Sequence, residues 1–278
     1  MQNVFDKEEK YKLYRSIREI IHPSISKMNI SDYRIVIEED ILPLRIFYPK
    51  KVTNIDKVII YIHGNGKITN CHEEYTKILK KMAIKTNSLV IAIDYKEYEN
   101  ISSITNKLLK TIYYLYKELE RNELKHENIT LMGDSTGAYL ITVINYLDKE
   151  KIISKEVLLY PTLSLNYKSN TEYESINKNI IFNEDLTNNF EEYYNNIKDN
   201  NMDDEKYKPL DRNNNDTPNT LLIVGNVDCV KDEVSKYKDL LKEKAKYLEI
   251  PFLNHGFLKK MDKDIEEEFY KELNDYLN

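Results

Sequence analysis

The stretch that decides the fold is NITLMGDSTGAYLITVINYL, residues 128–147. It starts as an apolar run typical of a buried β-strand and ends at Gly133, and a helical pattern begins directly after Ser135. At such a junction the G-x-S-x-G spacing of residues 133–137 predicts a sharp turn that lifts the serine above the sheet edge. A glycine-lined structural turn with an ordinary serine cap is the alternative. We interpret Ser135 as a candidate nucleophile.

The alternation of strand and helix continues on both sides of this stretch. The apolar runs are DKVIIYIH, SLVIAIDY, EVLLYPTL, TPNTLLIVG and a last strand, KAKYLEIPF. Helices are expected at residues 72–86, 101–124, 136–150, 232–245 and 259–277. This order predicts an α/β fold with a mostly parallel central sheet and helices on both faces. Upstream, DYRIVIEED and LPLRIFYPKK predict a hairpin at one sheet edge.

Two segments interrupt this order. Residues 6–21 form an amphipathic pattern before Pro23, so residues 1–28 are expected to be an N-terminal helical cap segment. A long polar segment rich in Asn, Asp and Tyr follows EVLLYPTL, and residues 166–208 of it are expected to form a cap or lid insertion. A low-complexity decoration is the alternative. The first and second parts of the core are then residues 29–165 and 209–278.

Composition excludes several classes of protein. With 278 residues, 41% apolar residues and a net charge of −6, the chain can bury a sizeable core and has no basic block for nucleic acid. Cys71 and Cys229 have neither a disulfide pattern nor a zinc spacing, so no metal site is predicted. The N-terminus lacks an apolar signal, and no apolar run could span a bilayer, so a cytoplasmic protein without stable membrane insertion is expected.

A serine nucleophile needs a base and an acid that orients the base. Of five histidines, only His255 follows the nucleophile, in the turn after KAKYLEIPF, as the chain order Ser, Asp, His requires. Asp228 comes just past the end of a buried strand and is the expected acid. Asp232 is the alternative, but Asp232 and Glu233 suit the N-terminal dipole of the next helix and are explained as its caps. We interpret Cys229 as a small buried residue rather than a second nucleophile.

Four motifs together resemble those of the hormone-sensitive lipase family of α/β-hydrolases, carboxylesterases with an HGGG oxyanion motif. H-G-N-G, residues 63–66, follows a buried strand, and GDSTG is similar to the family's GDSAG. DCVKDE, residues 228–233, resembles its D-P-L-x-D-E, and residues 255–257 repeat its H-G-F. The resemblance spans about residues 57–258 and implies the α/β-hydrolase fold with a small cap.

The resemblance also implies roles for individual residues. The oxyanion hole would be built from backbone N–H groups of the loop Gly64, Asn65 and Gly66 together with that of Thr136. Asp134, His63 and Lys67 would lie at the substrate site. Asn65 replaces a family glycine and Lys67 stands where an aromatic residue is usual, so the substrate class stays open. No metal or organic cofactor is expected.

The predicted function is hydrolysis of short-chain acyl or acetyl esters through a Ser-His-Asp triad and an acyl-enzyme. An amidase, formamidase or deacetylase could use the same triad. A non-catalytic ligand binder that kept the fold is the alternative from a different class. The expected partner is a small-molecule ester, and the last strand, if exposed at a sheet edge, could pair with its copy in a homodimer.

Overall fold

A computed structural model describes residues 42–49, 55–64, 71–95, 100–164, 202 and 204–278. Within these residues, seven strands form one sheet in the order β1-β3-β2-β4-β5-β6-β7. Among these described strands only β1 is antiparallel to its neighbour, and the other neighbours pair in parallel. The strands are β1 Leu44–Phe47, β2 Val58–Ile62, β3 Leu89–Ile93, β4 Ile129–Asp134, β5 Lys155–Leu159, β6 Asn219–Gly225 and β7 Ala245–Ile250.

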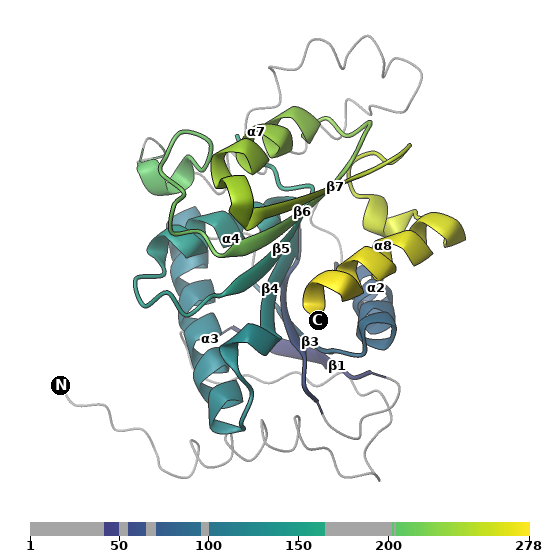
Figure 1. Cartoon of the computed structure of the whole chain (residues 1–278). Helices are drawn as coiled ribbons and strands as arrows, with labels where there is room; N and C mark the ends of the chain where they lie inside the picture. The colour runs from purple at the N-terminus through teal and green to yellow at the C-terminus, as the bar shows by residue number, and fades with distance from the viewer. Residues whose placement is uncertain (1–41, 50–54, 65–70, 96–99, 165–201, 203) are drawn as a thin grey trace, which may run out of the picture.

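Helices cover both faces of this sheet. They are α2 Cys71–Thr86, α3 Ile101–Arg121, α4 Thr136–Leu147, α7 Lys231–Leu241 and α8 Lys263–Leu277. In Figure 1, α3, α4 and α7 lie on one side of the sheet, and α2 packs with α8 on the other. Short 3-10 turns occupy His126–Asn128, Glu205–Tyr207, Lys242–Lys244 and Phe257–Lys259. The predicted fold class, a mostly parallel sheet between helices, is confirmed.

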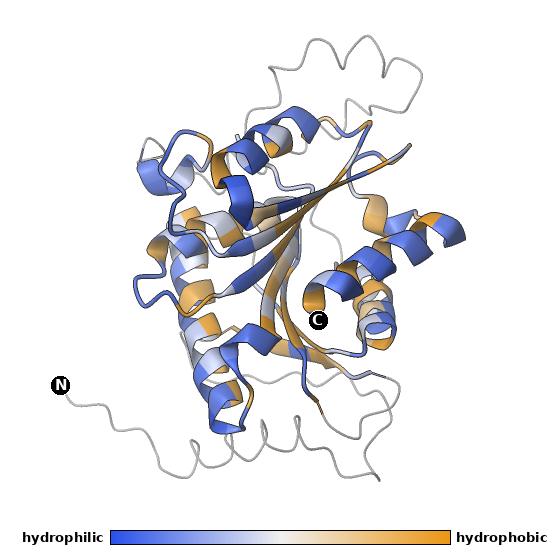
Figure 2. Cartoon of the chain, in the orientation of Figure 1, coloured by the Kyte–Doolittle hydropathy of each residue, from blue (hydrophilic) through white to orange (hydrophobic). Residues whose placement is uncertain are grey.

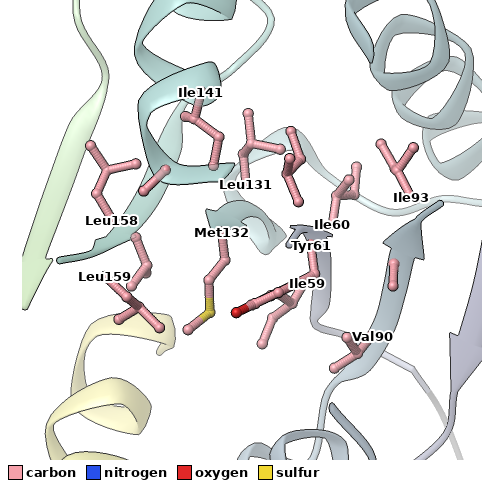
Figure 3. Close-up of a cluster of buried hydrophobic side chains, with 14 of the residues drawn as sticks. Ile59, Ile60, Tyr61, Val90, Ile93, Leu131, Met132, Ile141, Leu158 and Leu159 are labelled. Carbon is pink, nitrogen blue, oxygen red and sulfur yellow. The ribbon is translucent and has the colours of Figure 1, made fainter. Parts of the chain in front are cut away.

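The core lies between the sheet and these helices. All residues of β2 and β4 are buried, as the uninterrupted apolar runs predict for central strands covered on both faces. Figure 3 shows side chains of β2, β4 and β5, with Ile141 of α4, gathered in the core. In Figure 2 the hydrophobic colour follows the strands, while the outward surfaces of the helices are hydrophilic.

Several helix ends differ from the predicted ones. The last helix begins at Lys263 rather than 259, because a 3-10 turn precedes it and Asp262 caps it through the Ile265 N–H at 2.9 Å. The helix expected to reach 245 ends at Leu241, because Lys242 has a positive φ of 55° and starts a 3-10 turn. Positive φ stops a right-handed helix.

Some predictions fall on residues outside the described part. These are the helix at 6–21, the first hairpin strand and most of the 166–208 insertion, so the domain boundaries stay predictions. From the end of the insertion, Tyr207 is buried, and its carbonyl accepts a hydrogen bond from the Tyr139 hydroxyl of α4 at 3.1 Å.

The outer strands of the described sheet are β1 and β7. Pairing of β7 with its copy in a homodimer would require β7 to lie at a sheet edge, as it does in the described sheet. The homodimer itself stays a prediction. No helix in the described ranges combines the length and apolar character needed to cross a membrane.

Candidate active site

Ser135 lies in a strained turn between β4 and α4. Its backbone has φ 51° and ψ −121°, a conformation rare for a residue with a side chain, which costs roughly 1–3 kcal/mol. The Ser135 N–H donates to the Leu159 carbonyl at 2.9 Å and so ties the turn to β5. Gly137 is required here, since an added Cβ would lie 2.3 Å from the Ile62 carbonyl oxygen. The predicted sharp turn is present, and it holds the serine at the carboxyl edge of the sheet.

His255 and Asp228 meet Ser135 at this edge. The His255 Nε2 lies 2.8 Å from the Ser135 Oγ. Its Nδ1 lies 3.1 and 3.2 Å from the two carboxylate oxygens of Asp228. With the ring proton on Nδ1 and donated to the carboxylate, Nε2 is left to accept the serine proton. The fold thus brings together the three residues that the sequence predicted as a triad.

Asp228 is fully buried, and its turn holds it in place. The Val230 N–H donates to its Oδ1 at 3.0 Å. Gly225 precedes this turn, where a Cβ would lie 2.0 Å from the Leu253 carbonyl oxygen. The loop that carries the base therefore runs directly against the end of the strand that carries the acid.

Two opposing effects set the pKa of His255. Burial disfavours the imidazolium and by itself lowers the pKa, but the charge and hydrogen bond of Asp228, together with the charges of Asp134 and Glu233, outweigh it. The net result is a pKa raised above the ordinary value. An imidazole with this environment accepts a proton more readily than one in water and is suited to general-base chemistry.

Tyr160 and Glu233 position the loops around this histidine. The Tyr160 ring packs edge-on against the His255 ring, with centroids 4.9 Å apart. Glu233 does not cap its own helix: its carboxylate accepts the N–H groups of Leu163 at 3.0 Å and Ser164 at 2.9 Å. This contact holds the segment after β5 against the start of α7.

Asp134 is the centre of a buried hydrogen-bond cluster. Its Oδ1 accepts from the Tyr61 hydroxyl at 2.6 Å and the Gly64 N–H at 2.9 Å. Its Oδ2 accepts from the Tyr75 hydroxyl at 2.6 Å and lies 3.5 Å from that of Tyr160. Burial, and then the charge of Asp134, raise the pKa of Tyr61 and Tyr75 well above the ordinary value, so both hydroxyls stay protonated donors.

This cluster makes the carboxylate of Asp134 a support for the loop that begins at Gly64. The side chain of Asp134 is buried, and four donors surround its two oxygens. The geometry therefore favours a positioning role over the direct substrate contact implied by the resemblance.

His63 and Gly64 lie directly behind the nucleophile turn. The His63 ring stacks on Tyr95 with centroids 4.3 Å apart, and the Tyr95 hydroxyl donates to the His63 carbonyl at 2.6 Å. A Cβ on Gly64 would lie 2.5 Å from the Asp134 carbonyl oxygen, so only glycine allows this approach. A cavity of about 20 Å³, room for one water, borders His63 and Tyr75.

The predicted oxyanion donors are only partly described. Thr136 is buried and begins α4 immediately after Ser135, so its N–H lies at a helix N-terminus. Asn65, Gly66 and Lys67 fall outside the described residues, and their roles stay predictions.

Cys229 is half-buried beside the acid. Burial, and then the charge of Asp228, raise the pKa of its thiol well above the ordinary value. A thiol in this state is not an activated nucleophile, in agreement with its interpretation as a packing residue.

Sequence reasoning missed the roles of Tyr61, Tyr75 and Glu233. Tyr61 offered one signal, because it is the only polar side chain in the buried run VIIYI and a buried hydroxyl needs a partner. Tyr75 and Glu233 offered no such signal. Tyr75 is 59 residues from Asp134, and Glu233 is 70 residues from Leu163 and 69 from Ser164.

Comparisons with known proteins agree with this architecture. A family model for the alpha/beta hydrolase fold matches residues 59–259, and this family contains carboxylesterases of the hormone-sensitive lipase type. A protein of Acanthamoeba polyphaga mimivirus that carries the name alpha/beta hydrolase R526 is 24% identical over 218 residues, 76% of this chain. An esterase of Fusarium pseudograminearum is 20% identical over 48% of this chain. The match spans 63% of the mimivirus protein and 44% of the Fusarium protein.

Solved structures share the fold at low identity. The Francisella virulence factor BioJ has a TM-score of 0.75 at 21% identity, covering 99% of this chain and 93% of its own. A hyperthermophilic esterase of Pyrobaculum calidifontis has a TM-score of 0.73 at 17% identity, covering 98% of this chain and 91% of its own.

Proposed function

The chain belongs to the alpha/beta-hydrolase-fold family, and from this premise we propose that it is a serine carboxylesterase acting on short-chain acyl or acetyl esters. One observation carries the proposal: a strained serine lies 2.8 Å from a histidine whose other nitrogen lies 3.1 Å from a fully buried carboxylate. This is the arrangement that activates a serine hydroxyl for attack on an acyl carbon.

In the first half-reaction, the Ser135 Oγ attacks the ester carbonyl carbon while the His255 Nε2 takes its proton. Asp228 holds the imidazole tautomer and stabilises the imidazolium that forms. When the tetrahedral intermediate collapses, the bond to the alcohol oxygen breaks and His255 returns the proton to the leaving alcohol. The product is an ester of Ser135 with the acyl group.

In the second half-reaction, the His255 Nε2 takes a proton from water, and the resulting hydroxide oxygen bonds to the acyl carbon. The bond to the Ser135 Oγ then breaks, the serine recovers its proton from His255, and the carboxylic acid leaves. The chemistry needs no metal or organic cofactor, and the proposed partner is the ester substrate itself.

The negative charge of both tetrahedral intermediates needs donors that are already in position. We assign this role to the N–H groups of Asn65, Gly66 and Thr136. Asp134 acts as a positioning residue, because its Oδ1 holds the Gly64 N–H at the start of this loop. Losing one such donor costs about 100- to 1,000-fold in rate.

The proposal is tested by serine labelling and turnover. The protein should show a burst with p-nitrophenyl acetate or butyrate and should be labelled by a fluorophosphonate. Ser135→Ala should lose both and keep the circular dichroism spectrum of the parent. No burst together with no labelling would overturn the proposal.

A substrate panel tests the acyl chain and the leaving group. Short acyl chains are favoured because Asn65 and Lys67 place polar side chains where the family has glycine and an aromatic residue. Turnover that peaks with long chains would contradict this part. Faster cleavage of formamides or aminoacyl amides than of acetyl esters would instead identify an amidase. Ligand-induced stabilisation without turnover, unchanged in Ser135→Ala, would identify a binding protein.

A further inference from the structure

Three potential metal ligands converge beside the nucleophile. One ligand atom each of Asp228, Cys229 and His255 lie within 4.8 Å of one another. The similar family motif, D-P-L-x-D-E, has proline where this chain has Cys229. The thiol is therefore a feature of this chain and not a requirement of a Ser-His-Asp triad.

The spacing suits a tetrahedral ion. Zinc bonds of about 2.0 Å to nitrogen and oxygen and 2.3 Å to sulfur place tetrahedral ligands roughly 3.3–3.6 Å apart. The His255 Nδ1 already lies 3.1 and 3.2 Å from the Asp228 oxygens, so these two need to separate by only a few tenths of an ångström. The sulfur and the other two ligand atoms lie within 4.8 Å of one another, so the sulfur would have to approach to the roughly 3.5 Å of a tetrahedral site.

We propose that Asp228, Cys229 and His255 bind a thiophilic divalent cation of the Zn²⁺ or Cd²⁺ class. The ion forms bonds to a carboxylate oxygen, the sulfur and the Nδ1; the thiol proton leaves to solvent, and the ring proton moves from Nδ1 to Nε2, so the imidazole binds as a neutral ligand. One carboxylate and one thiolate then balance the two positive charges. A water completes the fourth position.

Such an ion would inhibit the enzyme. It replaces the hydrogen bond between Nδ1 and Asp228, which orients the base for Ser135. This inhibitory part rests on the proposed function, whereas binding of the ion does not. A sulfur and imidazole ligand set favours Zn²⁺ and Cd²⁺ over Mg²⁺ and Ca²⁺, which prefer oxygen ligands.

Two of the three ligands keep some exposure to solvent. Asp228 is fully buried, but the side chain of His255 is 10% exposed and Cys229 is half-buried. The cation would therefore enter from the side of Cys229 and His255. The spacing of cysteines in the sequence predicted no zinc site, because His255 is 26 residues beyond Cys229 and only the fold brings them together.

The first experiment measures binding without turnover. Ser135→Ala protein is titrated with Cd²⁺, and bound metal is counted by equilibrium dialysis while ultraviolet absorption reports the thiolate–metal bond. We expect one equivalent with a thiolate signal. The signal should disappear in the double variant with Cys229→Ala and persist in the one with Cys71→Ala, the other cysteine of the chain. A signal that persists without Cys229 would overturn the site.

The second experiment measures inhibition. Cys229→Ala and Cys229→Ser should keep ester turnover and need roughly 100-fold more Cd²⁺ for half-inhibition, since even ligand-supporting contacts change metal affinity 10- to 100-fold. Circular dichroism checks the fold of both variants. Equal inhibition of wild type and both variants would overturn the proposal. Metal binding in a protein without esterase activity would support the site and reject the proposed function, so the two failures are distinguishable.

Discussion

Asp134 and Glu156 are both buried carboxyl groups on neighbouring strands, but at opposite ends and on opposite faces of the sheet. In the register of β4 and β5, Glu156 lies opposite Leu131. Leu131 comes three residues before Asp134, so the two carboxyl groups are separated by roughly 10 Å along the strand direction. Asp134 accepts hydrogen bonds from tyrosine hydroxyls and from the Gly64 N–H beside the nucleophile. Glu156 accepts from Asn145 of α4 and, at 2.8 Å, from Thr220 of β6.

Asp134 supports the candidate active site, whereas Glu156 connects elements within the core. Four groups, from β2, α2 and two loops, meet at Asp134, so its carboxylate fixes a loop relative to Ser135. Glu156 instead joins α4 to two strands near their amino ends, away from the reacting groups. Burial raises the pKa of Glu156 to about 7, despite its hydrogen bonds and the charge of Arg212. The carboxyl edge carries the chemistry, and the amino end carries a polar contact within the core.

The largest expected effect is that of Asp228→Asn at the carboxyl edge. The amide stabilises the wrong imidazole tautomer and no longer balances an imidazolium, so we expect kcat for p-nitrophenyl acetate to fall by about 10⁴-fold. Glu156→Gln is the matched amide substitution at the amino end and should leave kcat within about twofold. Comparable losses in both variants would contradict the division between the two ends.

Asp134→Asn should lower kcat by about 10²-fold, with a smaller change in KM. The amide keeps the volume but gives up one acceptor oxygen, which loosens the loop at Gly64 and its oxyanion donors. Steady-state kinetics and the rate of fluorophosphonate labelling both report the effect. An unchanged kcat in a folded variant would reject the positioning role of Asp134.

Glu156→Gln should change stability rather than activity. The pKa of Glu156 in the folded protein, about 7, is above the ordinary 4.5. The stability that Glu156 contributes is therefore fully present below pH 4.5 and is lost as the pH rises through 7. The shift corresponds to about 3 kcal/mol. In urea unfolding, the free energy of unfolding of the variant minus that of the wild type should rise by about 3 kcal/mol between pH 5 and pH 8. A difference that does not change with pH would contradict the burial argument.

Tyr75→Phe should have the smallest effect, about a tenfold loss in kcat. It removes one of the donors to Asp134 and leaves the Gly64 N–H and Tyr61 in place. Tyr116→Phe is the control, because that buried hydroxyl has no hydrogen-bond partner among the described residues. If both variants lose the same activity, the loss at Tyr75 is not specific to the cluster.

The sequence predicts the strands and the nucleophile turn because both depend on local signals. Continuous apolar runs mark strands buried on two faces, and G-x-S-x-G marks the junction at Ser135. Chain order selects His255, and the position past a strand end selects Asp228. Each of these inferences uses residues close together in the chain or a simple order along it.

The clusters could not be predicted because they depend on side chains that meet only in three dimensions. Asp134 and Tyr75 are 59 residues apart, and Glu156 and Thr220 are 64 apart. A lone glutamate inside EVLLYPTL gives no indication of its partners. Glu233 was explained locally as a residue of a helix start, whereas its carboxylate binds backbone N–H groups of a segment about 70 residues earlier.

The backbone of Ser135 bears on how this chain evolves. Its φ of 51° is a conformation that glycine adopts without strain. Selection for stability alone would therefore favour replacement of this serine by glycine. A lineage that had lost the need for the hydroxyl would gain stability by the change to glycine. A relative with glycine at this position would therefore be expected to have lost the serine chemistry.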